Sequence, residues 1–562
     1  MTIDNYYIAD QFSLLSKLMD IHGENSFKTK SYSIAAFNIE KLPEQLANIS
    51  QDKIFAIKGI GDAIGKKIIQ IIETGELQLL KEYIQKTPPG LIEMLGIKNI
   101  GPKKIATIWK EMEIESVGEL LYACNENRLL LYKGFGEKTQ KNIQDSIEFF
   151  LKNQGNYLYA EAEPYALDIT DKLKKQFPDE KFELTGEFKR QLEIINKLEW
   201  ITTTATVLLQ NFFHANSFTI ENHSGNELVI KHPEGIILQF HSSNEKSFYN
   251  DLFKNNSSAE FLHSWKENTS WNENENFNSE EEIFSSVKIN FIPSYLRENL
   301  KIIDKAKKSA LPSFINEKDI KAIIHSHSNW SDGSNTIEEM ANHCIKKGYE
   351  YFVISDHSKS AFYANGLNEE RIKEQHHYID ELNKKLSPFK IFKSIESDIL
   401  NDGSLDYTDN ILSTFDLIIA SVHSNLKMTE EKAMMRLLRA IENPYTTILG
   451  HMTGRLLLSR PGYPVDHKKI IDACVANSVV IELNAHPRRL DIDWRWIENA
   501  LEKNVLISID PDAHSLHGYD DVKYGTLVAQ KAGLTKEKNL SSFSLIEFEN
   551  FLSERKKMKS AN

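Results

Sequence analysis

Histidines and carboxylates that could bind metal ions recur at one kind of position in the second half of the chain. Each follows a short apolar run, and the first run, Ile323-Ile324, leads into His325-Ser326-His327. Residues i and i+2 of a strand point to the same face, so these two imidazoles are expected side by side. Imidazoles and carboxylates gathered in one place indicate a metal centre. The candidate ligands are His325, His327, Asp332, His357, Glu396, His423, His451, Asp512 and His514.

Regular elements must place these side chains. Seven apolar runs begin near residues 323, 351, 390, 417, 446, 479 and 505, mostly separated by helix-length amphipathic segments. This alternation predicts a parallel sheet, and seven or eight such strands predict a barrel with its catalytic groups at the carboxyl ends of the strands. Nine ligand-type side chains on one rim exceed the needs of one ion. They suit two or three ions, with Glu396 as a bridge.

The ligands can be divided among these ions. We expect one ion at His325, His327, Glu396 and Asp512, and a second at Asp332, His357 and Glu396, which leaves His423, His451 and His514 for a third ion or for phosphate. A histidine-rich site with mixed nitrogen and oxygen donors favours Mn²⁺, Zn²⁺ or Fe²⁺ over Mg²⁺. Taken singly, each histidine could equally be a core or surface residue.

Three further residues near strand ends are candidates for substrate binding. Arg455 and Arg489 lie just beyond strand ends, where a guanidinium could clamp phosphate oxygens, and Asn484 ends the sixth run. Surface ion pairing is the alternative for the two arginines.

The order of these residues resembles the PHP phosphoesterase domain, and in particular the PHP domain that ends bacterial family X DNA polymerases. Ala364-Asn365-Gly366-Leu367, Gly450-His451-Met452-Thr453-Gly454-Arg455 and Arg489-Leu490-Asp491 carry the closer match. The resemblance covers roughly residues 315 to 530 and implies a distorted (β/α)7 barrel with a trinuclear metal site. One departure is Ile323, where the family has an Asp two residues before the first histidine. We expect it to affect the surroundings of the ligands and not a ligand itself.

Length and composition set the frame for the rest of the chain. A chain of 562 residues is too long for one core, which favours three or four domains. The net charge of −13, with 18 Lys+Arg against 20 Asp+Glu in residues 1–150, argues against a strong general field for nucleic acid. Three widely spaced cysteines, no signal segment and no long apolar window predict a cytoplasmic protein without disulfides or a membrane span.

Three glycine-containing turns in the first 150 residues each open a lysine-bearing helix. Free backbone N–H groups at such helix starts bind phosphate. The turns resemble helix-hairpin-helix modules that grip DNA without reading its sequence, although a structural or protein-binding role is an alternative. The expected DNA-binding residues are Gly59, Gly61, Lys66, Gly101, Lys103, Lys104, Gly134 and Gly136.

The same region, with Gly23-Glu24-Asn25, Tyr32 and Ala35-Ala36, resembles the lyase and fingers parts of family X polymerases. By that resemblance Lys67 falls at the Schiff-base position of a lyase. A solvated helix face would explain Lys67 as well.

The middle of the chain departs from the polymerase pattern. Polymerase chemistry needs two or three carboxylates around its metal ions. The family's Asp-x-Asp pair falls here on Lys197 and Glu199, and its third Asp on Gln239. A charged lysine cannot ligate Mg²⁺ and one carboxylate cannot hold two ions, so we infer that polymerase activity is lost.

The predicted organisation is multidomain, α and α/β. It comprises a lyase-like helical domain at 1–80, a fingers-like helix-hairpin-helix domain at 81–152, a degenerate nucleotidyltransferase-like α+β palm and thumb at 153–300, and the PHP barrel at 301–562. The predicted function is a metal-dependent hydrolase: a 3′–5′ exonuclease or 3′-end-processing enzyme of base-excision repair, acting on gapped, nicked or recessed DNA. The alternatives are a working gap-filling polymerase, a small-molecule phosphatase of the histidinol-phosphate type, and a DNA scaffold without activity.

Overall fold

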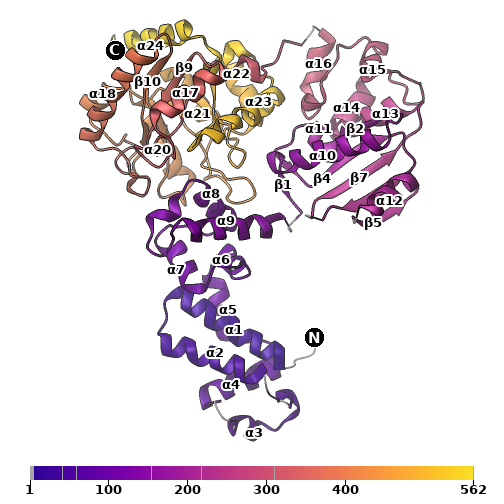
Figure 1. The fold of residues 1–562 in the computed structure, drawn as a ribbon, viewed down its shortest axis with the longest axis vertical. Helices are drawn as coiled ribbons and strands as arrows, with labels where there is room; N and C mark the ends of the chain where they lie inside the picture. The colour runs from indigo at the N-terminus through magenta and orange to yellow at the C-terminus, as the bar shows by residue number, and fades with distance from the viewer. Residues whose placement is uncertain are drawn as a thin grey trace. The chain divides into compact units, whose positions relative to one another are not determined.

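The chain folds as two compact units, Met1–Phe150 and Leu151–Asn562 (Figure 1). The computed structural model describes residues 5–40, 42, 44–57, 60–152, 155–216, 218–233, 235–308 and 311–560. Among the described helices, none combines the length and the apolarity that a membrane crossing requires. The finer domain borders near residues 80 and 300 stay predictions.

The N-terminal unit is built from α-helices joined by short turns. Helix α1 (Asn5–His22) buries Ile8, Phe12 and Leu15, as the helical spacing of these residues predicts, and packs against α2 (Ser26–Glu40). The two helices meet at Gly23, whose φ of 81° suits glycine. The helices that follow are α3 (Gln51–Phe55), α4 (Asp62–Thr74), α5 (Gln78–Lys86), α6 (Pro89–Met94), α7 (Pro102–Lys110), α8 (Val117–Asn125) and α9 (Glu137–Lys152).

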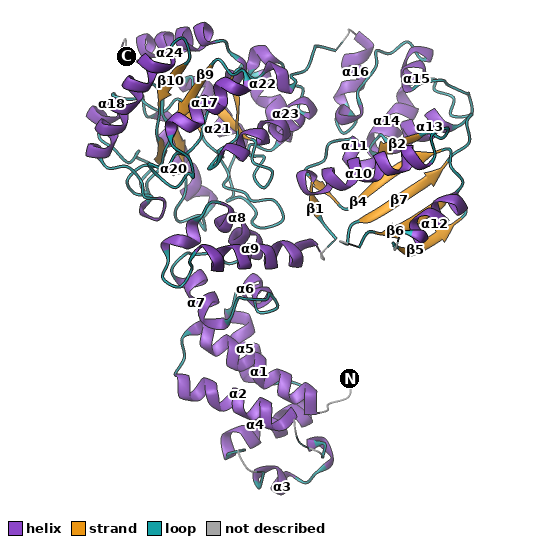
Figure 2. Ribbon diagram, in the orientation of Figure 1, coloured by secondary structure: helices purple, strands orange, loops and turns teal. Residues whose placement is uncertain are grey.

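A mixed sheet with the strand order β2-β4-β7-β6-β5 forms the start of the second unit (Figure 2). Alternate residues of the neighbouring parallel strands β4 and β7, such as Trp200 and Phe240, share a core with helices α10 and α12. The intervening residues of both strands therefore lie on the opposite face. The elements are β1 (Tyr157–Leu158), α10 (Tyr159–Gln176), β2 (Phe182–Thr185), α11 (Gly186–Lys189), β3 (Ile194–Ile195), β4 (Lys197–Thr202), α12 (Thr206–Ala215), β5 (Thr219–Ser224), β6 (Glu227–Lys231) and β7 (Ile237–Ser242).

Four helices after this sheet surround an aromatic core. Arg297 lies within this core, fully buried, where its guanidinium stacks on Phe253 and Phe284 and pairs with Glu280. The helices are α13 (Phe248–Asn255), α14 (Ala259–Asn268), α15 (Glu280–Ser286) and α16 (Lys301–Lys308).

Residues 311–560, described without a gap, form a barrel of parallel strands. The predicted third run is interrupted between β10 and β11, and isolated bridges from Ser326 to Ala513 and from His357 to Glu396 join the two resulting sheets. This arrangement confirms the predicted C-terminal α/β fold. The strands are β8 (Ala322–Ile323), β9 (Tyr351–Ile354), β10 (Lys390–Lys393), β11 (Glu396–Asp398), β12 (Ile419–Ser421), β13 (Ile448–Leu449), β14 (Val480–Asn484) and β15 (Ile507–Asp510).

Helices follow most of these strands, and the last helix, α24 (Leu545–Ser560), covers the opposite end of the barrel from the ligands. Phe548 of α24 stacks at 4.6 Å on Tyr351, the first residue of β9, and packs edge-on against Phe392 of β10. The other helices are α17 (Ile337–Lys347), α18 (Glu369–Leu386), α19 (Asp409–Leu412), α20 (Glu430–Glu442), α21 (His467–Asn477), α22 (Trp494–Glu502) and α23 (Val522–Lys531).

Candidate metal centre

The candidate ligands all lie at or just beyond the carboxyl ends of the barrel strands. Glu396 opens β11, three positions after the last residue of β10, and His423 and His451 follow the last residues of β12 and β13 by two positions. His325 and Asp512 adopt left-handed backbone conformations, with φ of 61° and 51°. Such conformations cost about 1–3 kcal/mol for residues other than glycine. The backbone bond from His327 N to Ala513 O, 2.9 Å long, links the two segments that hold them.

Glu396 lies at the middle of the cluster. Its Oε1 is 3.0 Å from His451 Nε2, 3.1 Å from His423 Nε2 and 3.2 Å from His325 Nε2. Its Oε2 is 3.0 Å from His357 Nδ1 and 3.6 Å from His327 Nε2. The carboxylate is fully buried, so one negative charge is shared by five imidazoles. This central position is the one expected for a bridging ligand.

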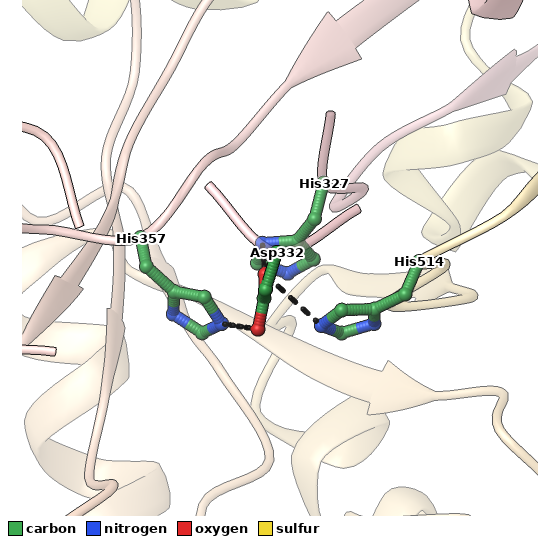
Figure 3. A group of neighbouring side chains, drawn as sticks. All are labelled: His327, Asp332, His357 and His514. Atoms are coloured by element: carbon green, nitrogen blue, oxygen red, sulfur yellow. Dashed lines mark ion pairs between the residues drawn. The ribbon is translucent and has the colours of Figure 1, made fainter. Parts of the chain in front are cut away.

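A second group surrounds Asp332. Figure 3 shows the imidazoles of His327, His357 and His514 around this carboxylate. Asp332 Oδ2 is 3.6 Å from His357 Nε2, and Asp332 Oδ1 is 3.6 Å from His514 Nε2 and 4.0 Å from His327 Nδ1. The ring of His327 stacks on those of His357 and His514 at 4.3 Å. His327 therefore connects this group with the group around Glu396.

The division of the ligands differs in part from the prediction. His325, His327, Glu396 and Asp512 form one metal-competent group, as expected. His423, His451 and His514, which were left for a third ion or for phosphate, do not all lie together, because His514 follows Asp512 on its loop and stacks on His327, beside Asp332. His423 instead groups with His357 and Glu396, and His451 lies on the same carboxylate.

The donor atoms fit metal ions. Ligands about 2.1 Å from one tetrahedral ion lie roughly 3.4 Å from each other, and most of the separations above fall between 3.0 and 3.6 Å. Several buried donor atoms in the cluster also make no hydrogen bond among the described residues, which is costly unless something else satisfies them. These atoms include His327 Nδ1 and His451 Nδ1.

Proton affinities in the cluster follow from burial and from the neighbouring charges. Burial alone would raise the pKa of Asp332, but the imidazoles of His357 and His514 hold it below its usual range. Burial and these same two imidazoles lower the pKa of His327 to about 3, which leaves its ring neutral and able to ligate. Burial would also lower the pKa of His423, yet Glu396 and Asp398 raise it to about 10.

Two buried carboxylates that the sequence analysis did not single out orient the ligands. Glu482 Oε2 is 2.6 Å from His325 Nδ1, and its Oε1 accepts a hydrogen bond from His451 N at 3.0 Å. Asp398 binds His423 Nδ1, so the other ring nitrogen faces Glu396. Carboxylates in this role fix the tautomer of a ligating imidazole. The available signals were a glutamate inside the apolar run 479–483 and an aspartate two residues after Glu396.

The candidate substrate residues separate in space. Arg489 Nε is 3.5 Å from Asp512 Oδ2, and Asn484 Nδ2 donates to the same oxygen at 3.1 Å, so both lie beside the cluster. Arg455 follows the alternative expectation, ion pairing, but the pairs are largely buried and do not lie on the surface. Its guanidinium pairs with Glu193 at 2.5 Å and with Asp493 at 2.6 Å, and is directed to these carboxylates.

The three residues predicted to replace the polymerase carboxylates, Lys197, Glu199 and Gln239, meet on the face of the middle sheet that lies opposite α10 and α12. Glu199 and Gln239 are paired in the parallel register of β4 and β7. Lys197 Nζ is 2.6 Å from Gln239 Oε1 and 2.8 Å from Glu199 Oε1. The ammonium group of Lys197 thus contacts a side-chain oxygen of both neighbours.

The predicted DNA-binding turns end at helix starts in the N-terminal unit. Gly61 and Gly101 directly precede α4 and α7, and Gly136 precedes α9, while Gly134 has a φ of 97°. Lys66 and Lys103 are exposed, whereas Lys104 donates to Asn99 O at 3.1 Å. Lys67 lies 5.8 Å from the ring centroid of Tyr32. Gly59 lies outside the described residues.

Comparison with known proteins decides the family. A protein of Bacillus subtilis strain 168 named DNA polymerase/3′-5′ exonuclease PolX is 31% identical over 557 residues, which cover 95% of this chain and 96% of that protein. The chain belongs to the bacterial PolX-like family X DNA polymerases. The match runs through the helical, middle and barrel regions alike.

Separate regions of this PolX-like chain match known domain families. Residues 3–77 match a helix-hairpin-helix domain, residues 91–148 a SAM-like helix-hairpin-helix tandem, and residues 324–486 the PHP domain. Part of the chain also resembles shorter proteins. A protein named "Probable phosphatase" from Thermoanaerobacter sp. strain X514 is 26% identical over 235 residues, which cover 40% of this chain and 89% of that protein. The likeness to PolX therefore extends over nearly the whole chain, and the likeness to this phosphatase over two fifths of it.

Proposed function

We propose that this PolX-like chain is a metal-dependent phosphodiesterase that trims DNA 3′ ends in base-excision repair, with the PHP barrel as its active domain. The observation that carries the proposal is the single buried cluster around Glu396, which gathers imidazoles from four strand ends of the barrel. Two or three bound ions, of Mn²⁺, Zn²⁺ or Fe²⁺, would polarise a scissile phosphate and supply a nucleophile from water at neutral pH.

The residues of the chain prepare the cluster for this chemistry. Glu482 and Asp398 hold the ring orientation of His325 and His423 through their Nδ1 atoms. Arg489 brings a positive charge to the edge of the cluster, where it can pair with a phosphate oxygen once Asp512 is engaged by an ion. Burial of the carboxylates strengthens each of these electrostatic interactions.

The helix-hairpin-helix regions would hold the substrate. Their glycine turns present backbone N–H groups at the starts of α4, α7 and α9, and such groups bind phosphates of any sequence. The name of the Bacillus subtilis relative refers to a 3′–5′ exonuclease, which supports DNA as the polymer and the 3′ end as the starting point.

The middle sheet would no longer polymerise. Lys197 occupies the space between Glu199 and Gln239. Its ammonium group would therefore take the place of a Mg²⁺ ion at this site and repel one. The relative's name includes a polymerase, and the proposal therefore departs from that relative on the strength of these three residues.

A comparison of substrates tests the proposal. The full-length chain loaded with Mn²⁺ is given a duplex with a recessed 3′ end and, separately, a small phosphomonoester. We expect stepwise shortening of the DNA and slow turnover of the monoester. The rival phosphatase function, which the similarity of the barrel to smaller proteins favours, predicts fast monoester turnover and intact DNA.

A further inference from the structure

The loop of residues 485–493, which follows β14, contacts the candidate metal cluster along one side. Arg489 Nε lies 3.5 Å from Asp512 Oδ2, and both side chains are buried. The residue before the loop, Asn484, donates to the same carboxylate oxygen at 3.1 Å. We call residues 485–493 the arginine loop. The position of this loop therefore determines the contact between Arg489 and the candidate ligand Asp512.

Carboxylates of the predicted palm and thumb, residues 153–300, contact the other side of the arginine loop. We call residues 153–300 the polymerase-like region. Glu193, which precedes β3, pairs with Arg455 at 2.5 Å, and Arg455 Nε donates to Arg489 O at 2.9 Å. Glu161 of α10 pairs with Arg488 Nη2 at 2.9 Å. Two acidic residues far from the barrel in sequence thus fasten the backbone and one side chain of the loop.

Burial distinguishes the contact between Glu193 and Arg455 from an ordinary surface ion pair, whereas Glu161 is partly exposed beside the buried Arg488. The side chains of Glu193 and Arg455 are 9% and 13% exposed. Removing one partner of an exposed ion pair changes the folding free energy little, whereas removing one partner of a buried pair is much more costly. Arg455 also donates to Leu490 O and pairs with Asp493. Because Arg455 thus contacts the loop at Arg489, Leu490 and Asp493, a substitution of Glu193 that moves Arg455 should also move the loop.

We infer that Glu193 and Glu161 are positioning residues of the phosphodiesterase centre, which hold the arginine loop so that Arg489 lies against Asp512. The inference rests on the proposed function. It assigns a use to a polymerase-like region whose own metal positions are occupied by Lys197 and Gln239. The region would complete the nuclease site, and the barrel alone would be a poorer enzyme.

The test compares two substitutions in the full-length chain with a matched control. Glu193→Gln and Glu161→Gln each remove one fastening charge from the loop. Glu163→Gln removes a contact between the same two regions, to Lys523 and Tyr524 of α23, which does not involve the loop. The probes are Mn²⁺ binding measured by calorimetry and hydrolysis of bis(4-nitrophenyl) phosphate, a diester too small to need the DNA-binding regions.

We expect Glu193→Gln to lower kcat, or to weaken Mn²⁺ binding, by about 10–100-fold, with little change in KM, and Glu163→Gln to match the wild type. Glu161→Gln should act in the same direction. Combined with Arg489→Ala, Glu193→Gln should cause no further loss, because both act through the same contact. Wild-type values for Glu193→Gln, equal losses in Glu193→Gln and Glu163→Gln, or additive losses in the double variant would each overturn the inference. If the wild type hydrolyses no diester, the proposed function fails, while Mn²⁺ binding still decides the inference.

Discussion

At the scale of single residues, the spacing of histidines after apolar runs was enough to predict which side chains gather. Parallel strands of a barrel bring their carboxyl ends to one rim, so sequence order alone placed Glu396 among imidazoles. The orienting carboxylates were harder to foresee. The bond between Glu482 and His325 joins residues 157 positions apart, and Arg455 and Glu193 are 262 positions apart. No local pattern carries information over such separations.

Glu396 is the residue whose loss should affect the cluster most. Glu396→Gln removes the charge shared by five imidazoles, so the chain should retain less Mn²⁺ after gel filtration and lose diester hydrolysis by more than about 100-fold, beyond the range typical of residues that only orient ligands. Metal analysis and a hydrolysis assay check both. Glu381→Gln, at an exposed glutamate paired with Lys384, serves as the control. Unchanged Mn²⁺ content in Glu396→Gln would contradict the central role.

Metal binding should release protons in mildly alkaline solution. Glu396 and Asp398 overcome the effect of burial and raise the pKa of His423 to about 10, so this ring is protonated at pH 8 in the metal-free chain and must lose its proton to ligate. Calorimetry of Mn²⁺ binding in two buffers of different ionisation enthalpy should show fewer protons released by His423→Asn than by wild type, by about one. The exposed His263→Asn variant should match wild type. Equal proton release in all three would refute the assignment.

The raised pKa of His423 also determines how the stability of the metal-free chain changes with pH. A folded-state pKa of about 10 exceeds the unfolded value of about 6.5, so the contribution of His423 is fully present below pH about 6.5 and is lost as the pH rises through about 10. The melting temperature of the metal-free wild type should therefore fall between pH 7 and pH 10 more than that of His423→Asn. Parallel melting curves for the two proteins would contradict this.

At the scale of elements, the sequence predicted the barrel strands and left their closure open. The third run was expected to be continuous, whereas the strand breaks between β10 and β11 at residues 394–395 and leaves Glu396 at the start of the new segment. Periodicity reports which face of a strand is buried and cannot report where neighbouring strands stop pairing. In the middle region, the register of β4 against β7 brings together residues that alignment to a family pattern could only suggest.

Helix α24 should contribute strongly to the stability of the barrel. Phe548 is fully buried against Tyr351 and Phe392, so Phe548→Ala should lower the free energy of unfolding by about 3–5 kcal/mol. Ile546→Ala, in the same helix but 71% exposed, should change it by less than about 0.5 kcal/mol. Urea-induced unfolding of the full-length chain measures both. Equal urea midpoints of unfolding for the two variants would show that the packing of α24 does not stabilise the barrel.

The pairing of β4 with β7 predicts a negative result in primer extension. In a background of His325→Ala/His327→Ala, which prevents trimming from hiding synthesis, the chain should add no nucleotide to a gapped duplex in Mg²⁺ or Mn²⁺. The reason is that Lys197 lies between Glu199 and Gln239 and repels an incoming ion. Template-dependent extension in that background would overturn the proposed loss of polymerase activity.

At the scale of the whole molecule, resemblance to a family predicted the succession of helical, middle and barrel regions. The contacts between the polymerase-like region and the barrel could not be anticipated, because they depend on pairs such as Glu161 and Arg488 that a linear sequence does not connect. Because the N-terminal region is near neutral, we expect its DNA affinity to depend on a few local contacts.

DNA binding and phosphodiester hydrolysis should be affected by different substitutions. Lys103→Ala removes an exposed ammonium at the start of α7, so DNA affinity should fall for every sequence and the slope of log affinity against log salt should decrease by about 0.9. Hydrolysis of the small diester should be unchanged. Lys175→Ala, which alters an exposed lysine of α10, is the control for charge. Fluorescence anisotropy with two unrelated duplexes measures the effect, and an unchanged slope would exclude Lys103 from the DNA interface.

The most direct test of the central claim is degradation of a duplex labelled at its 3′ or its 5′ end, in Mn²⁺, by wild type and by His325→Ala/His327→Ala. Wild type should release the 3′ label at once and shorten the 5′-labelled strand in single steps. The double variant should do neither, because two imidazoles of the cluster are missing. Intact DNA with a Mn²⁺-loaded wild type, or equal trimming by both proteins, would contradict a phosphodiesterase in the barrel.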